Sequence, residues 1–116
     1  MAIARACYSL TKQFPKEEIY GMTAQIRRAA ASIAANIAEG HGRENTGSFI
    51  QYLRIAQGSL KELETHLLLA EQVQVAKSSG SEPILAQCES LGKMLRSLIL
   101  SLQERTARAS ENSSDD

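Results

Sequence analysis

Residues that could bind a metal are few in this sequence, and their spacing does not suit a metal site. The two histidines are His41 and His66, with Glu39 two residues before the first and Glu62 four residues before the second. Helix bundles that hold two metal ions use Glu-x-x-His pairs from facing helices, and the sequence contains no such pair. We therefore expect no metal ligands and no cofactor.

Nucleophilic catalysis has no better support. The two cysteines, Cys7 and Cys88, fall on apolar helical stripes, and free cysteine is among the most buried residue types. The aspartates are Asp115 and Asp116, at the end of the chain, so no Ser–His–Asp or Cys–His arrangement is indicated. We predict two reduced core cysteines, no catalytic residue and no enzymatic activity.

A Gly-x-Gly sequence at Gly40 and Gly42 is a weak sign of phosphate binding. It lacks the preceding strand and the Gly-Lys-Ser/Thr ending of a phosphate-binding loop. Gly40 stands where a helix should end, so we expect it to be a left-handed helix-stop residue instead.

One helical stretch carries a face that is polar throughout, with residues spaced 3, 4, 4 and 3 positions apart between Gln25 and Glu39. With polar residues of the next helix, this face could form an interhelical hydrogen-bond network, which would fix register and subunit geometry. A ligand or RNA contact and plain solvated charge are the alternatives. The predicted polar seam comprises Gln25, Arg28, Ser32, Asn36, Glu39, Arg54, Ser59 and Glu62.

These residues must be positioned by helices, because four segments repeat apolar residues at alternating spacings of 4 and 3. The spacing predicts helices over residues 2–13, 19–39, 46–75 and 82–107. Short loops between such helices favour an all-α, up-down-up-down, left-handed antiparallel four-helix bundle over residues 1–109. A disordered polar tail is expected over 110–116.

Local signals refine this prediction. Asn45 is expected to cap the third helix and Ser81 the fourth, with Pro83 in the first turn of the latter. Gly58 lies inside the third helix but off its apolar stripe, which suggests close approach of a neighbouring backbone.

Charge and hydropathy exclude some protein classes. Net charge is zero, although residues 1–58 carry seven basic and four acidic groups and residues 59–116 carry six and nine. No apolar run reaches the ~18 residues of a transmembrane helix, and no signal peptide is evident. We expect a soluble, cytoplasmic protein that does not enter a membrane.

Nucleic-acid binding remains an alternative, because an oligomer would repeat a weak basic patch around a ring. Ordinary solvated charge is the competing interpretation. The candidate contacts, expected at one end or flank of the bundle, are Arg5, Lys12, Lys16, Arg27 and Arg43.

Several motifs resemble the "four helix bundle protein" family, also called the 23S rRNA intervening-sequence protein family. They are residues 10–18 (LTKQFPKEE), 25–29 (QIRRA), 32–33 (SI), 36–40 (NIAEG), 42–43 (GR) and 56–65 (AQGSLKELET). Two departures stand out. The first helix starts later than in most members, and Ser48 replaces the usual glutamate that would complete a capping box with Asn45.

The resemblance implies a bundle that assembles into a homopentameric barrel. The accessory protein of diversity-generating retroelements looks like a distant relative; it is a pentamer that binds a reverse transcriptase and nucleic acid. We therefore expect a non-enzymatic homo-oligomeric scaffold or adaptor whose partners are its own copies and RNA or another protein. An RNA-binding protein tied to rRNA intervening sequences or mobile elements is the first alternative, and a metal or small-molecule enzyme is the second.

Overall fold

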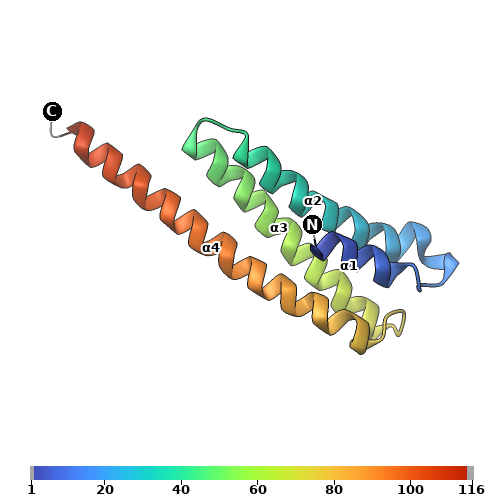
Figure 1. Cartoon of the computed structure of the whole chain (residues 1–116). Helices are drawn as coiled ribbons and strands as arrows, with labels where there is room; N and C mark the ends of the chain where they lie inside the picture. The colour runs from blue at the N-terminus through green and yellow to red at the C-terminus, as the bar shows by residue number, and fades with distance from the viewer. Residues whose placement is uncertain (1, 115–116) are drawn as a thin grey trace.

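The protein is built from four α-helices that alternate in direction (Figure 1). The computed structural model describes residues 2–114, except the side chains of residues 19–20 and 112–114. The helices are α1 (Ala2–Thr11), α2 (Ala24–His41), α3 (Thr46–Gln72) and α4 (Ser78–Ser114). A 3-10 turn, η1 (Lys16–Glu18), and a π-helical turn, η2 (Ile19–Thr23), lead into α2. The predicted all-α, four-helix class is confirmed.

The core consists of the apolar stripes that the 4–3 spacing places on one face of each helix. Ile26 and Ile33 of α2 and Leu53, Leu63 and Leu67 of α3 are fully buried. Each such side chain contributes about 1.5–3 kcal/mol of burial free energy. The heptad-like stripe of α3 therefore forms the centre of the molecule, with α2 and α4 packed against it.

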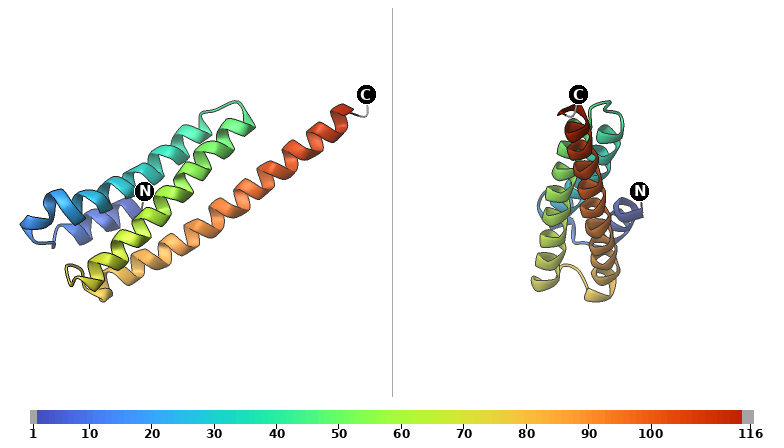
Figure 2. Two further views of the ribbon diagram at one scale, coloured as in Figure 1. Left: turned by 180° about the vertical axis from the view of Figure 1, so that it is seen from behind. Right: turned by 90° about the vertical axis from the view of Figure 1, so that its left-hand side faces the viewer.

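The bundle has four helices over only part of its length, because α1 is short. It has 10 residues and is about 15 Å long, whereas the 27 residues of α3 span about 40 Å. Figure 2 shows α1 beside the end of the bundle where α3 leads into α4, with the N-terminus near the middle. The other end contains α2, α3 and α4 alone.

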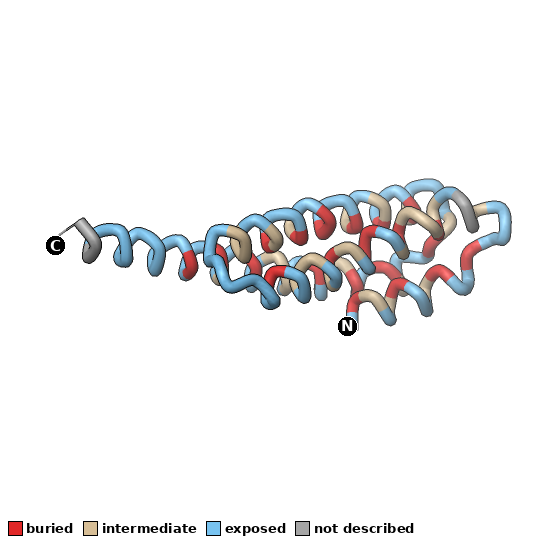
Figure 3. Tube along the Cα trace, turned by 90° about the horizontal axis from the view of Figure 1, so that it is seen from above, coloured by how far each residue is buried: buried red, intermediate tan, exposed pale blue. Residues whose placement is uncertain are grey.

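The last helix is longer than the sequence pattern predicts. It has 37 residues, and the molecule measures 63 × 21 × 19 Å. Beyond Leu102, α4 passes the α2–α3 connection and carries exposed residues through Glu111 (Figure 3). Residues 110–114, expected as a polar tail, continue this helix, because no glycine or proline interrupts them; residues 115–116 lie outside the described part.

Other helix boundaries also differ from the predicted ones. The first helix ends at Thr11 rather than 13, and the third at Gln72 rather than 75. The segment expected to begin α2 is a π-helical turn whose Gly21 departs from helical backbone angles (φ −99°, ψ −106°). Gly21 therefore marks a kink in the turn that leads into α2.

The predicted N-terminal cap is present at α3 but not at α4. Asn45 caps α3 as predicted, since its Oδ1 accepts a hydrogen bond from the Ser48 N–H at 3.1 Å. Ser81 does not begin α4, because the helix starts at Ser78 and the carbonyl of Lys77 accepts the Gly80 and Ser81 N–H groups. The Ser81 hydroxyl instead donates to the Glu71 carboxylate of α3. Pro83 consequently lies beyond the first turn.

The predictions for Gly40 and Gly58 were both wrong. No described glycine has positive φ, and α2 continues through Gly40 to His41. A Cβ on Gly40 would lie 2.9 Å from Phe49 Cδ1 and 3.1 Å from Tyr52 Cβ, so Gly40 provides the close approach of α2 to α3. A Cβ on Gly58 would meet nothing within 4 Å. The left-handed position is Gln74, with φ of 62°.

Gly40→Ala should lower the free energy of unfolding by about 1–3 kcal/mol, because the added methyl group overpacks the contact with Phe49 and Tyr52. Gly58→Ala is the matched control. It should raise the free energy of unfolding by about 0.5–1 kcal/mol, because a helix-interior alanine restricts the unfolded chain and meets no neighbour here. Urea unfolding followed by circular dichroism measures both, and two changes of the same sign would contradict this assignment.

Candidate functional site

The polar seam is present between α2 and α3 as a small hydrogen-bond network. Ser32 Oγ lies 2.8 Å from Ser59 Oγ across the two helices. Asn36 Nδ2 donates to the Ser32 carbonyl at 2.8 Å and to Ser32 Oγ at 3.1 Å. Ser59 is buried and the other two are half-buried. These three residues fix the register of α2 on α3 at one point.

The other predicted seam residues do not join this network. Arg28 reaches Gln25 of its own helix, with a long 3.5 Å contact from Nη1 to Oε1. Glu39 pairs with Arg43, 2.6 Å from its Nη2. Arg54 lies in a groove between α3 and α4, and Glu62 is exposed. Arg28 and Glu39 thus contact residues three or four positions away in the chain instead of residues on α3. A role of the predicted seam residues in assembly stays a prediction.

The five candidate nucleic-acid contacts do not form one patch. Arg27 lies near the start of α2 and Arg43 beyond its end, about 24 Å apart at 1.5 Å per residue. Lys12 and Lys16 belong to the α1–α2 connection, at the Arg27 end. Arg5 is exposed on α1. The structure thus separates Arg43 from the others.

Two of these arginines have structural contacts. Arg27 Nε donates to Thr11 Oγ1 at 2.8 Å, and its guanidinium lies 4.5 Å from the centre of the Tyr8 ring. Arg43 Nη2 donates to the Tyr52 hydroxyl at 2.8 Å and stacks over that ring at 4.9 Å. Arg27 therefore attaches α1 to α2, and Arg43 attaches the α2–α3 connection to α3.

Both cysteines are free and buried in the core, as expected for Cys7 of α1 and Cys88 of α4. Burial raises the pKa of the Cys7 thiol to about 11. Burial, with smaller effects of the Glu64 carboxylate and Cys7, raises the pKa of the Cys88 thiol to about 12. Neither thiol is therefore available as a thiolate near neutral pH.

Sequence reasoning missed an apolar groove at the end of the bundle that α1 does not cover. It has a volume of about 540 Å³ and lies between α2, α3 and α4. Met94, at its rim, is 68% exposed. The signal in the sequence was a methionine directly before the Leu95 stripe position. The groove is lined by Ile37, His41, Leu53, Leu91, Lys93, Met94, Leu95, Ser97 and Leu98.

Two negative findings apply to the described chain alone. Within residues 2–114, no three His, Cys, Asp or Glu side chains gather in a way that could hold a metal ion. None of the helices described there combines the length and apolarity that a membrane crossing requires.

Ser59→Ala should lower the free energy of unfolding by about 1 kcal/mol, because it removes the interhelical partner of Ser32. Glu39→Ala is the matched control in the seam. It removes only a partly exposed ion pair within one chain segment and should cost no more than about 0.5 kcal/mol. Thermal and urea unfolding measure both, and a larger effect of Glu39→Ala would show that the seam depends on charge instead.

Stability should fall as pH rises above about 9, where thiols of the unfolded chain ionise and those of the folded chain do not. The folded-state pKa values of Cys7 and Cys88 are raised, so their stabilisation is complete below the unfolded pKa and is lost towards pH 11–12. Each thiol contributes up to about 1.4 kcal/mol per pH unit in this window. A Cys7→Ala/Cys88→Ala variant should show a flatter decline in urea unfolding at pH 8–10.5, and identical slopes would contradict the assignment.

A family profile and a solved structure are similar to this chain. The profile of the family described as "23S rRNA-intervening sequence protein" matches residues 1–97. A crystal structure of a protein with unknown function from the S23 ribosomal protein family of Bacteroides thetaiotaomicron is similar, with 28% sequence identity and a TM-score of 0.72. The alignment covers 84% of this chain and 88% of that one. No protein in the curated set matches this chain, and neither description assigns an enzymatic activity.

The match covers most of the chain and includes every motif on which the resemblance depends, so the resemblance is confirmed. This chain belongs to the 23S rRNA-intervening sequence protein family.

Proposed function

We propose that the protein is a subunit of a homo-oligomeric, non-enzymatic helical scaffold. The observation that carries this proposal is the apolar groove between α2, α3 and α4, with Met94 at its rim. A fourth helix would cover such a groove in a complete bundle, and the described α1 lies beside the other end (Figure 2). Apolar surface of this kind is characteristic of protein–protein contacts.

A second surface of the same chain complements the groove. Ala31, Ala35 and Ala38 are exposed on α2 at spacings of 4 and 3, so they share one helix face. Ile55 of α3 is 46% exposed. Small residues let another helix approach closely, so the groove of one copy can receive the α2–α3 face of the next.

Such a contact joins two different surfaces, and repeated contacts of this type close into a ring when the rotation between subunits permits. The number five comes from the family resemblance alone. The family description assigns no activity, and both buried thiols stay protonated near neutral pH, which supports a role in binding rather than catalysis.

In multi-angle light scattering, the wild-type protein should have a mass of about 63 kDa, five times the chain mass of 12.6 kDa. Met94→Glu should shift this mass towards the monomer, because a carboxylate in the groove opposes burial against a second copy. Met94 is mostly exposed in the single chain, so the helical content should be unchanged.

Ser90→Glu provides the control, since Ser90 is exposed on the same helix and is not among the residues that line the groove. It should leave the mass at the wild-type value. A wild-type mass near 13 kDa at micromolar concentration would refute the proposal, and equal effects of the two substitutions would refute the assigned surface.

A further inference from the structure

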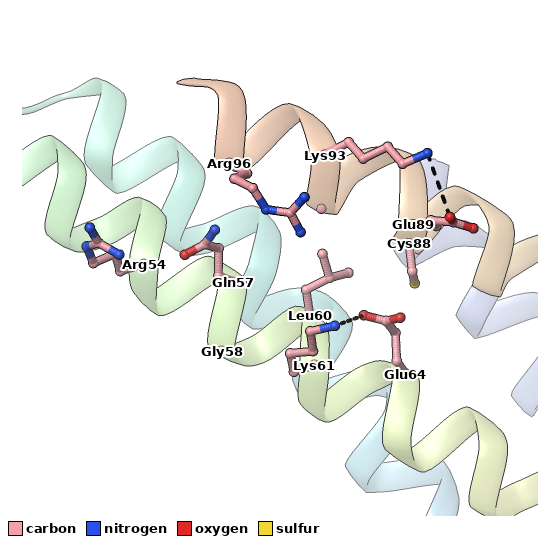
Figure 4. A pocket seen from close by; sticks show the side chains of 11 residues that line it. Arg54, Gln57, Gly58, Leu60, Lys61, Glu64, Cys88, Glu89, Lys93 and Arg96 are labelled. Atoms are coloured by element: carbon pink, nitrogen blue, oxygen red, sulfur yellow. Dashed lines mark ion pairs between the residues drawn. The ribbon is translucent and has the colours of Figure 1, made fainter. Parts of the chain in front are cut away.

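A second groove lies on the molecule between α3 and α4, and its charges have no role in the packing described above. It has a volume of about 730 Å³, within the range of small-molecule sites. Figure 4 shows Gln57 and Leu60 of α3 and Arg96 of α4 reaching into the space between the two helices. All of its lining residues come from one chain, so the groove does not depend on the proposed oligomer.

The lining residues leave an excess of positive charge. Lys61 pairs with Glu64 at 3.8 Å, and Lys93 pairs with Glu89 at 3.7 Å, each within its own helix (Figure 4). Arg54 and Arg96 have no hydrogen-bond or ion-pair partner in the described chain. The two lysine–glutamate pairs cancel, so the two guanidinium groups give the groove a net charge of +2.

The floor of the groove is apolar. Leu60 and Cys88 are buried lining residues. Gly92 of α4 faces this floor, since a Cβ on Gly92 would lie 3.5 Å from Leu60 Cδ2. The missing side chain of Gly92 leaves room for a flat group beside Leu60.

We propose that this groove binds a phosphate-bearing ligand, with its phosphate groups held by Arg54 and by Arg96 and its organic body lying over Leu60 and Gly92. Guanidinium groups bind phosphate oxygens through paired, charge-assisted hydrogen bonds. The cationic residues span positions 54–61 on α3 and 93–96 on α4, so the charged length is about 10 Å. That length accommodates one or two nucleotide units, either as a free phosphorylated molecule or as a short part of an RNA strand.

The proposal differs from the basic surface expected from the sequence. None of the five residues predicted to contact nucleic acid lines this groove. Arg54, which the sequence placed in the polar seam, contributes to it instead.

Isothermal titration calorimetry at low ionic strength tests the proposal, with pyrophosphate, adenosine monophosphate and a ten-nucleotide single-stranded RNA as separate probes. At least one probe should bind to the wild-type protein. Its affinity should fall by about tenfold or more in Arg54→Gln and in Arg96→Gln, because each removes a charged hydrogen-bond donor. Binding of the two small probes would identify a free phosphorylated molecule as the ligand, and binding of RNA alone would identify a strand.

Two further variants separate a groove from general charge attraction. Gly92→Leu keeps every charge but fills the space beside Leu60, because a Cβ on Gly92 would lie 3.5 Å from Leu60 Cδ2, so it should reduce affinity to a similar extent. Arg108→Gln removes an exposed cation elsewhere on α4 and should leave affinity unchanged. Circular dichroism and light scattering verify that each variant keeps its fold and mass.

Absence of binding by all three probes would overturn the proposal. So would equal losses in Arg108→Gln and Arg96→Gln, or unchanged affinity in both arginine variants of the groove. The oligomer is measured separately through Met94→Glu, so failure of one proposal leaves the other distinguishable.

Discussion

Close packing of α2 against α3 is the constraint on which the rest of the structure depends. Ile26 and Ile33 meet the buried leucines of α3, and Ser32 and Ser59 hold the two helices in register. At the closed end of this hairpin, Gly40 lets Phe49 and Tyr52 lie directly against α2. Both remaining helices pack on the hairpin, so any shift in its register would displace the surfaces that α1 and α4 occupy.

The difference in helix length determines where the molecule leaves surface uncovered. α1 covers one end of the hairpin, where Arg27 contacts Tyr8 and Thr11. At the other end, α4 packs alone and leaves apolar side chains such as Met94 exposed. The single chain is therefore a complete bundle at one end and an incomplete one at the other, which makes its surface chemistry asymmetric along the long axis.

Periodicity predicted the helices well, because the 4–3 spacing of apolar residues reports directly which face is buried. Single residues were harder. Gly40 provides the close helix approach that was expected at Gly58, and neither glycine ends a helix, since spacing does not say which glycine faces a neighbouring helix. The polar seam was predicted as one network, but Glu39 found Arg43 four residues away and Arg28 found Gln25. Partners three or four residues apart in the chain are always close, whereas partners between helices depend on a register that sequence spacing does not contain.

The position of the two thiols makes α1 observable in a way that the other helices are not. Cys7 belongs to α1, and both Cys7 and Cys88 of α4 are buried in the same core cluster. A helix of 10 residues is marginal without tertiary contacts, so α1 is the element best suited to detach while the hairpin stays folded. Its detachment would open both sulfur atoms to solvent, and the rate of thiol labelling would then report the local opening equilibrium of a single helix.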